Sequence, residues 1–113
     1  MVLATTTDAV FHALANPVRR KVLERLAARP ATVSELAEPF SMRLPSFVQH
    51  LAVLERSRLV KSTKRGRVRT YEIAPERLAV VDDWLAARRR TWEARLDRFD
   101  AYVITLKQKD SAP

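Results

Sequence analysis

The chain contains one glycine among its 113 residues, Gly66, and the position of this residue strongly restricts the fold. Two runs rich in β-branched and aromatic residues, 59–64 and 68–73, flank it. This arrangement predicts a β-hairpin, because glycine readily adopts the positive φ that a tight hairpin turn requires. A single glycine also excludes glycine-rich phosphate loops, dinucleotide-binding fingerprints and Gly-x-Ser-x-Gly hydrolase elbows, which all need more than one.

Helical patterns precede the predicted hairpin. Asn16-Pro17 predicts the start of a helix that extends to about residue 28, since Asn is a good N-cap and Pro suits the first helical position. Thr32-Val33-Ser34-Glu35 has the form of a capping box and predicts a short helix that stops before Pro39.

A further helix is expected over residues 44–58, because Phe47, Leu51 and Leu54 recur at i, i+4 and i+7. If Phe47 points into the core, the opposite face of this helix is small and polar, as a helix that enters the DNA major groove requires. That face is predicted to carry Ser46, Gln49, Ala52, Val53 and Arg56.

The helical pattern returns over residues 75–107. Its apolar residues recur every seven positions, and two more form a second row. A helix of this length spans roughly 48 Å, more than the width of a small domain, so its apolar stripe needs a partner beyond its own core. A second copy of the chain is the simplest partner. The stripe consists of Leu78, Leu85, Trp92, Leu96, Phe99, Val103 and Leu106.

Positive charge is concentrated in one part of the sequence. The whole chain carries a formal net charge of +8, and residues 43–69 hold eight basic residues and one acidic residue, a net of +7. Such a concentration is typical of a surface that binds a polyanion. By charge alone, a solvated basic face is an equally good interpretation.

Other features exclude several classes of site. The chain has no cysteine, and its two histidines, His12 and His50, are far apart in the sequence, so we expect no metal site and no cofactor. No apolar run reaches the roughly 20 residues of a membrane span. Residues 1–5 lack the basic region of a secretory signal, so we expect a cytoplasmic protein. Ser34 and Ser46 have no accompanying base or oxyanion motif, and we expect no enzymatic activity.

Two short helices, a tight turn, a third helix and a basic hairpin form the pattern of a winged helix-turn-helix. The expected fold is mostly α with a small β-hairpin wing (α+β), in a single domain over residues 1–113. We place the helix-turn-helix at 32–58, the wing at 59–73 and a long C-terminal dimerisation helix at 75–107.

Several ordered motifs carry a resemblance to a known family. Residues 11–23 (FHALANPVRRKVL), 32–37 (TVSELA) and 49–60 (QHLAVLERSRLV), with Arg65-Gly66-Arg67 and the Tyr71 that follows, resemble ArsR/SmtB-type winged-helix repressors. The resemblance extends from residue 8 to about residue 106, and residues 84–97 resemble a metal-independent branch of this family. It implies a homodimer in which the first and last helices pack across a two-fold axis.

The chain also departs from the family pattern. Arg43 stands where a serine usually caps the recognition helix, and arginine cannot accept the backbone N–H bonds that a cap receives. Val48 stands where a serine is also common, so a base or phosphate contact is lost. The Cys pairs and Asp/His sets of the family's metal sensors are absent, which implies that these sensing mechanisms are absent too.

The predicted function is a sequence-specific DNA-binding transcriptional regulator, a homodimeric repressor that binds a pseudo-palindromic operator on double-stranded DNA. No membrane or metal partner is expected, and the sequence identifies no small-molecule effector. The predicted DNA-binding residues are Thr32, Ser34, Arg43, Ser46, Gln49, His50, Arg56, Lys64, Arg65, Arg67 and Arg69. The predicted dimer-interface residues are Phe11, Leu14, Leu85, Trp92, Leu96, Phe99, Val103 and Leu106.

For the two histidines the sequence leaves alternatives open. His50 suits a DNA contact and structural packing equally well, and His12 is expected at the surface or the dimer interface. Two other functions also fit the pattern. An RNA-binding winged helix would use the same basic wing, and a protein-interaction module would use the long helix to dock a different partner.

Overall fold

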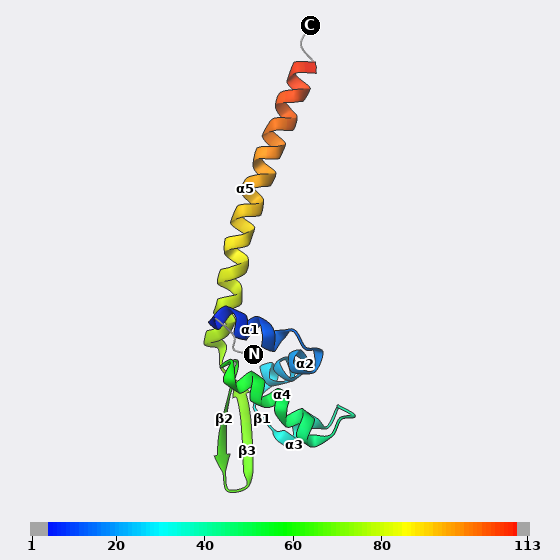
Figure 1. Cartoon of the computed structure of the whole chain (residues 1–113), viewed down its shortest axis with the longest axis vertical. Coiled ribbons are helices and arrows are strands. Elements are labelled where there is room, and N and C mark those ends of the chain that lie inside the picture. Colours follow the sequence, from blue (N-terminus) through cyan, green and yellow to red (C-terminus); the bar gives the residue numbers. More distant parts are fainter. Residues whose placement is uncertain (1–4, 111–113) are drawn as a thin grey trace. The chain divides into compact units, whose positions relative to one another are not determined.

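The structure is a computed structural model and describes residues 5–110 (Figure 1). Residues 1–4, on which the expected absence of a secretory signal partly rests, lie outside the described residues. The elements follow in the order α1 (Thr6–Leu14), α2 (Pro17–Ala28), β1 (Ala31–Thr32), α3 (Val33–Ala37), α4 (Leu44–Arg56), β2 (Val60–Arg65), β3 (Val68–Ile73), a 3-10 helix (Pro75–Arg77) and α5 (Leu78–Asp110).

The chain divides into two compact units within α5. The first ends at Val81 and the second begins at Asp82. The first contains all of the elements that precede α5 and also the first turn of α5, whose Leu78 and Val81 pack against the core.

The predicted caps of α2 and α3 are confirmed. The Asn16 carboxamide oxygen accepts the backbone N–H groups of Val18 and Arg19 at 2.8 and 3.3 Å. Thr32 and Glu35 form the reciprocal capping box, with bonds of 3.0 and 3.3 Å between each side chain and the other residue's backbone N–H. The bond from the Thr32 backbone is the main cause that lowers the pKa of Glu35, because it stabilises the carboxylate.

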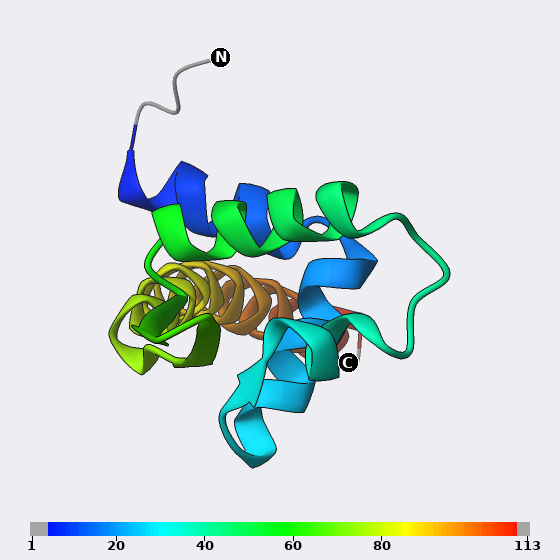
Figure 2. The same cartoon turned by 90° about the horizontal axis from the view of Figure 1, so that it is seen from below.

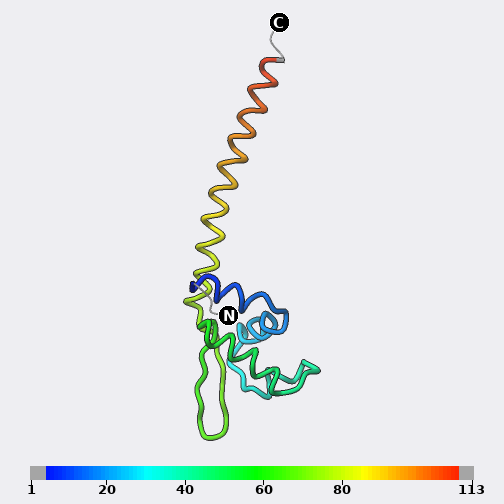
Figure 3. The backbone as a smooth tube through the Cα atoms, in the orientation of Figure 1, coloured from blue at the N-terminus to red at the C-terminus, as the bar shows by residue number. Residues whose placement is uncertain are grey.

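The predicted hairpin is confirmed, and a third strand joins it. The sheet is antiparallel with the order β1-β3-β2. Arg65 pairs with Val68, which leaves a two-residue loop that begins at Gly66 with φ 62°. Figure 3 shows the chain running out along β2 and back along β3. β1 was not predicted, because a strand of two residues is too short to show a sequence period.

The core of the first unit is formed by the apolar faces of α1, α2, α3 and α4 and by the base of the sheet. α4 packs against α2, α3 and β2, and Figure 2 shows it in green beside the N-terminal helices in blue. The side chains that are 2% exposed or less include Val10, Val22, Leu36, Phe47, Leu51, Leu54, Leu59 and Val60.

Three expectations need correction. α4 ends at Arg56 rather than at residue 58, because Arg58 adopts a left-handed conformation with φ 61° that a helix cannot continue. Val53 is not on the outer face of α4, since it packs against the core. The C-terminal α-helix begins at Leu78 rather than at residue 75, because residues 75–77 form a 3-10 turn, and it continues to Asp110.

The second unit consists of the remainder of α5. Many of its large apolar side chains are exposed, among them Phe99 at 62% and Leu96 at 60%. Across the described residues, no helix is long and apolar enough to cross a membrane.

Candidate nucleic-acid interface

α4 has one face in the core and one face open to solvent. Phe47, Leu51 and Leu54 are completely buried and fix the rotation of the helix. The side chains of Ser46 and Gln49 are therefore exposed on the outer surface, in the first two turns, and Arg56 is exposed in the last turn. As predicted, α4 therefore has a packing face and an opposite outer face, and the hydrogen-bonding groups on the outer face are accessible to another molecule.

The N-terminus of α4 has no side-chain cap. Arg43 occupies the N-cap position, and its side chain makes no capping hydrogen bond, as its chemistry predicts. The Arg43 side chain is exposed at the end of the helix where the first backbone N–H groups have no partner within the helix. Both are suited to a phosphate oxygen.

Two apolar side chains on α4 were not assigned to the site from the sequence. Leu44 is 54% exposed and Val48 is 41% exposed, one turn apart on the helix. For Val48 the available signal was its position, since it does not lie in the direction of Phe47, whereas Leu44 is exposed because it begins the helix. Exposed apolar groups on such a helix are of the kind that contacts thymine methyl groups in the major groove.

His50, for which the sequence left a DNA contact and structural packing open, takes part in a partly buried hydrogen-bond cluster inside the chain. Its Nδ1 lies 3.0 Å from Nη1 of Arg19, a side chain that is only 8% exposed. Arg19 also donates from Nε to the Ala13 carbonyl at 2.7 Å and from Nη2 to the His12 carbonyl at 3.0 Å. A guanidinium only donates, so Nδ1 accepts and the neutral ring carries its proton on Nε2. Burial, followed by the charge of Arg19, lowers the pKa of His50.

The other histidine, His12, is exposed on α1, as a place at the surface or at a dimer interface requires. In the described part of the chain, no group of three or more His, Asp or Glu side chains could hold a metal ion.

Two of the predicted DNA-binding cations, Lys64 and Arg69, lie on the side of the wing that also carries the buried Tyr71. Lys64 pairs with Arg69 in the register, and both are exposed near the tip. Arg69 Nη1 donates to Ser62 Oγ at 2.8 Å, and Ser62 Oγ donates to Glu55 Oε1 of α4 at 2.6 Å. This chain of bonds fixes the wing against α4, so the cations of the wing have a defined position relative to Gln49.

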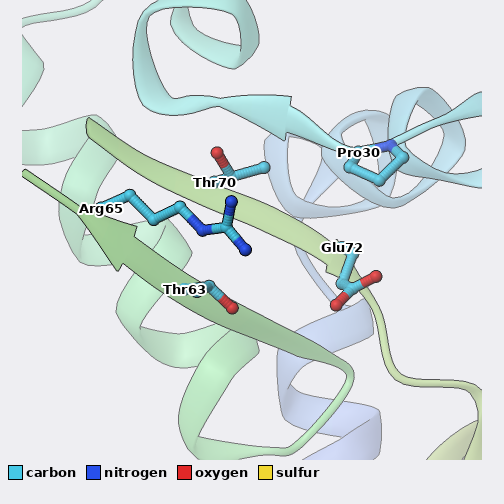
Figure 4. A pocket seen from close by; sticks show the side chains of 5 residues that line it. All are labelled: Pro30, Thr63, Arg65, Thr70 and Glu72. Carbon is cyan, nitrogen blue, oxygen red and sulfur yellow. The ribbon is translucent and has the colours of Figure 1, made fainter.

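The other side of the wing carries Arg65. It shares a shallow pocket of about 320 Å³ with Pro30, Thr63, Thr70 and Glu72, and Figure 4 shows its guanidinium extending over the hairpin from the tip. Arg65 is exposed, as predicted. The alternation of side chains along β2 thus places Lys64 and Arg65 on opposite sides of the wing.

A second pocket, of about 250 Å³, lies where α3 meets the wing. It brings together four of the predicted DNA-binding residues from segments that are far apart in the sequence: Thr32, Ser34, Arg67 and Arg69. The Thr32 hydroxyl already accepts the Glu35 backbone N–H, so its first role is the cap of α3.

The predicted dimer-interface residues fall into two groups. Phe11 and Leu14 on α1 are half-buried in the first unit, and Leu14 packs against the core. On α5, Leu85 and Val103 are half-buried. The remaining four are exposed by 43–62%: Trp92, Leu96, Phe99 and Leu106.

Comparisons with known proteins agree with this geometry. A protein family described as a helix-turn-helix domain matches residues 14–63. The HTH-type transcriptional regulator Rv2034 of Mycobacterium tuberculosis is 40% identical over 74 residues, which are 66% of this chain and 69% of the relative. The transcriptional repressor SdpR of Bacillus subtilis is 29% identical over 76 residues, which are 67% of this chain and 84% of the relative.

Solved structures show the same fold. The crystal structure of an ArsR family transcriptional regulator is similar with a TM-score of 0.76 and 50% identity, covering 78% of this chain and 91% of that one. A homodimeric winged helix-turn-helix DNA-binding domain from Mycobacterium bovis, described as a possible ArsR-family regulator, has a TM-score of 0.59 and 26% identity. The similarity covers 76% of this chain and 82% of that domain.

Proposed function

This chain belongs to the ArsR family of winged helix-turn-helix transcriptional regulators, and we propose that it is a homodimeric repressor that reads its operator with the outer face of α4. The observation that carries the proposal is the position of Ser46 and Gln49. They are exposed side by side on a helix whose opposite face is completely buried, with a basic wing beside it.

In this proposal α4 enters the major groove and contacts base edges. Gln49 has the donor and acceptor that pair with adenine, and Ser46 donates or accepts at a neighbouring base. Val48 and Leu44, which are exposed on the same helix, contact thymine methyl groups. Specificity therefore comes from a few side chains in the first two turns of α4.

Phosphate contacts come from the surrounding cations and from α3. Arg43 and Arg56 lie at the two ends of α4, and Lys64, Arg65, Arg67 and Arg69 lie on the wing. These contacts orient the protein on the duplex and supply most of the affinity that does not depend on sequence. The proposed uncharged donors to the DNA phosphates are the hydroxyl groups of Thr32 and Ser34 and the Nε2–H group of His50.

The dimer forms through α1, where Phe11 and Leu14 are half-buried, and through α5, where large apolar side chains are exposed. The similar domain from Mycobacterium bovis is described as homodimeric, which supports this assembly. A two-fold dimer presents two copies of α4 to major grooves about 34 Å apart, and so it binds a pseudo-palindromic operator. The name of the similar Bacillus protein supports repression as the outcome.

We further propose that DNA binding in the cytoplasm does not depend on a resident metal ion. The sequence has no cysteine, and one of its two histidines already accepts a hydrogen bond from Arg19 through Nδ1. The ligands that zinc prefers are therefore scarce in this chain.

The test measures specificity separately from affinity. We expect Gln49→Ala and Ser46→Ala to lose roughly 1–3 kcal/mol of operator affinity for each base contact removed, with binding to random duplex DNA nearly unchanged. Gln108→Ala removes the same side chain from α5 and serves as the control. Fluorescence anisotropy at one fixed salt concentration measures both affinities. If the ratio of specific to random affinity stays at the wild-type value in both variants, α4 does not read the bases.

A further inference from the structure

One buried side chain of α2 reaches both α1 and α4. Arg19 is only 8% exposed, and its guanidinium makes three hydrogen bonds. Two of them fix the group to the end of α1, through the carbonyl oxygens of Ala13 and His12. The third joins Nη1 of Arg19 to Nδ1 of His50 on α4, at 3.0 Å.

The charge of Arg19 is unusual for this position. Arginine is seldom buried in a protein unless an acidic group pairs with it. Among the residues that the structure describes, Arg19 forms no ion pair with a carboxylate. A neutral donor could join the two helices with a smaller loss of hydration, so helix joining alone gives no reason for a buried cation.

The three bonds determine the state of the His50 ring. A guanidinium is planar and carries only donors, so binding of Nε and Nη2 to α1 sets the direction of the Nη1–H group. Nδ1 of His50 must then accept. A ring with a proton on Nδ1 would place two N–H groups against each other. Arg19 therefore selects the neutral tautomer with its proton on Nε2, and it holds the ring in one orientation.

The Nε2–H group of His50 is available to another molecule. Within the described residues, the only hydrogen bond of the His50 side chain is the one to Arg19. Every buried side-chain nitrogen or oxygen in the same part of the chain has a hydrogen-bond partner. Because Nε2 has none, it is not buried and reaches solvent. His50 thus presents an oriented donor that the chain itself does not use.

The position of His50 on α4 indicates what this donor meets. Ser46 lies four residues earlier, and residues four apart lie on the same face of a helix. Ser46 is exposed and His50 is half-buried, so His50 lies where the outer face of α4 meets the core. When the outer face enters the major groove, this border lies beside the sugar-phosphate backbone, whose oxygens accept hydrogen bonds.

We propose that Arg19 is a positioning residue for DNA binding, which holds His50 as a neutral, oriented donor to a DNA phosphate oxygen through Nε2–H. The inference rests on the proposed function, because it requires α4 to lie on DNA. It extends the binding machinery to a side chain of α2 that itself touches no DNA.

Such a contact has its own signature. A cation that binds a phosphate releases counterions, whereas an uncharged donor neutralises no phosphate and releases none. Loss of the His50 contact should therefore weaken binding to specific and random DNA alike and leave the salt dependence unchanged. Loss of a base contact affects specific binding alone, and loss of a wing cation lowers the salt slope.

The variant His50→Asn separates the DNA contact from the fold. Its amide oxygen can accept from Arg19, but the amide is too short to replace Nε2–H at the phosphate. We expect the unfolding midpoint at neutral pH to stay close to the wild-type value. Both DNA affinities should fall about tenfold for each bond to phosphate that is lost, with an unchanged salt slope.

A double-mutant cycle tests whether Arg19 acts through His50. We expect Arg19→Ala to weaken both DNA affinities by roughly five- to tenfold, because the ring is no longer held. In the His50→Asn background the same change should cost nothing more, since the contact is already absent. Lys21→Ala, on the same helix with an exposed side chain, is the control and should bind as the wild type does. If Arg19→Ala has no effect, or has the same effect in both backgrounds, the proposal is wrong.

The wild-type protein provides a test that does not require Arg19→Ala to fold. The chain has two histidines, so nuclear magnetic resonance of nitrogen-labelled histidine observes two rings, and His12→Asn assigns them. At slightly alkaline pH we expect His50 to have a bare Nδ1 and a protonated Nε2. Operator DNA should then protect Nε2–H from exchange with solvent. A proton on Nδ1, or an Nε2–H group that remains unprotected, overturns the proposal.

Gln49→Ala separates the failure of this inference from the failure of the proposed function. If Gln49→Ala loses specific binding while His50→Asn binds as the wild type does, α4 reads the operator without His50, and only the inference fails. If neither variant changes the affinity, and Ser46→Ala does not change it either, α4 does not lie on the DNA and the proposed function fails as well.

Discussion

Arg19 joins three helices through a single buried side chain. It belongs to α2, donates to two carbonyl groups at the end of α1, and contacts His50 of α4. Ala13 and His12 are among the last residues of α1; the Ala13 carbonyl accepts from the guanidinium, and the His12 carbonyl accepts from it as well as from the backbone N–H of Ala15. The N-terminal helices and the recognition helix are thereby fixed relative to one another.

We expect Arg19→Ala to lower the free energy of unfolding by about 2–3 kcal/mol, because two carbonyl groups and His50 lose a charged donor. Lys21→Ala is the control on the same helix, with an exposed side chain. Chemical denaturation followed by circular dichroism measures both variants. Equal unfolding midpoints for the two would show that the Arg19 bonds contribute no net stability.

His50 should make the stability of the chain depend on pH. Its pKa in the folded state lies below the ordinary value of 6.5, so the folded state favours the neutral ring. The resulting stability is complete above about pH 6.5 and is lost as the pH falls through that value towards the folded pKa. Protonation places a second cation beside Arg19.

We expect the unfolding free energy of His50→Asn to fall less between pH 7 and pH 5 than that of the wild type, because the amide accepts from Arg19 but does not titrate. His12→Asn, at the exposed histidine, should behave as the wild type does. Denaturation midpoints across this pH range are the measurement, and parallel curves for all three proteins would contradict the role of His50.

At the level of single elements, the wing combines rigidity with exposed charge. The bonds from Arg69 through Ser62 to Glu55 hold the hairpin to α4, and the exposed cations surround the turn at Gly66. We expect a wing held in this way to add charge to the proposed DNA interface without reading bases.

We expect Arg65→Ala combined with Arg67→Ala to weaken binding to specific and random DNA equally. The slope of log affinity against log salt should fall by roughly one to two units, since each phosphate contact contributes about 0.9. Arg29→Ala, an exposed arginine at the C-cap of α2, is the matched control. An unchanged slope in the salt titration would mean that the tip of the wing does not touch phosphate.

For the whole molecule, the proposed dimer depends on the exposed stripe of α5. Phe99 is 62% exposed and Val103 is half-buried in the single chain. In the proposed dimer both are covered by a second copy, so charge placed there would be buried without a partner.

We expect the double variant Phe99→Asp, Val103→Asp to be monomeric by light scattering and to lose specific operator binding, because one half-site contact replaces two coupled contacts. The control is Ile104→Asp, which is 55% exposed but lies outside the stripe. A double variant that remains dimeric and binds normally would place the interface on α1 around Phe11 and Leu14.

Local sequence signals were sufficient for much of the fold. The caps at Asn16 and Thr32, the hairpin turn at Gly66 and the core residues of α4 depend on neighbours within a few positions, so the sequence alone indicates them. The same is true of the exposure of Ser46 and Gln49, because the period of a helix sets which face a buried Phe47 leaves open. These were the residues from which the family and the recognition helix were inferred.

Other features depend on contacts between segments that are distant in the sequence. β1 exists because its two residues pair with β3, nearly forty positions later, and no local period marks so short a strand. The pairing of His50 with Arg19 joins residues 31 positions apart, and the meeting of Thr32 and Ser34 with Arg67 spans a similar distance. Sequence periodicity reports which side of an element is apolar. The packing of whole elements decides which distant polar groups come into contact. For this reason the hydrogen bond between His50 and Arg19 could be found only in the folded chain.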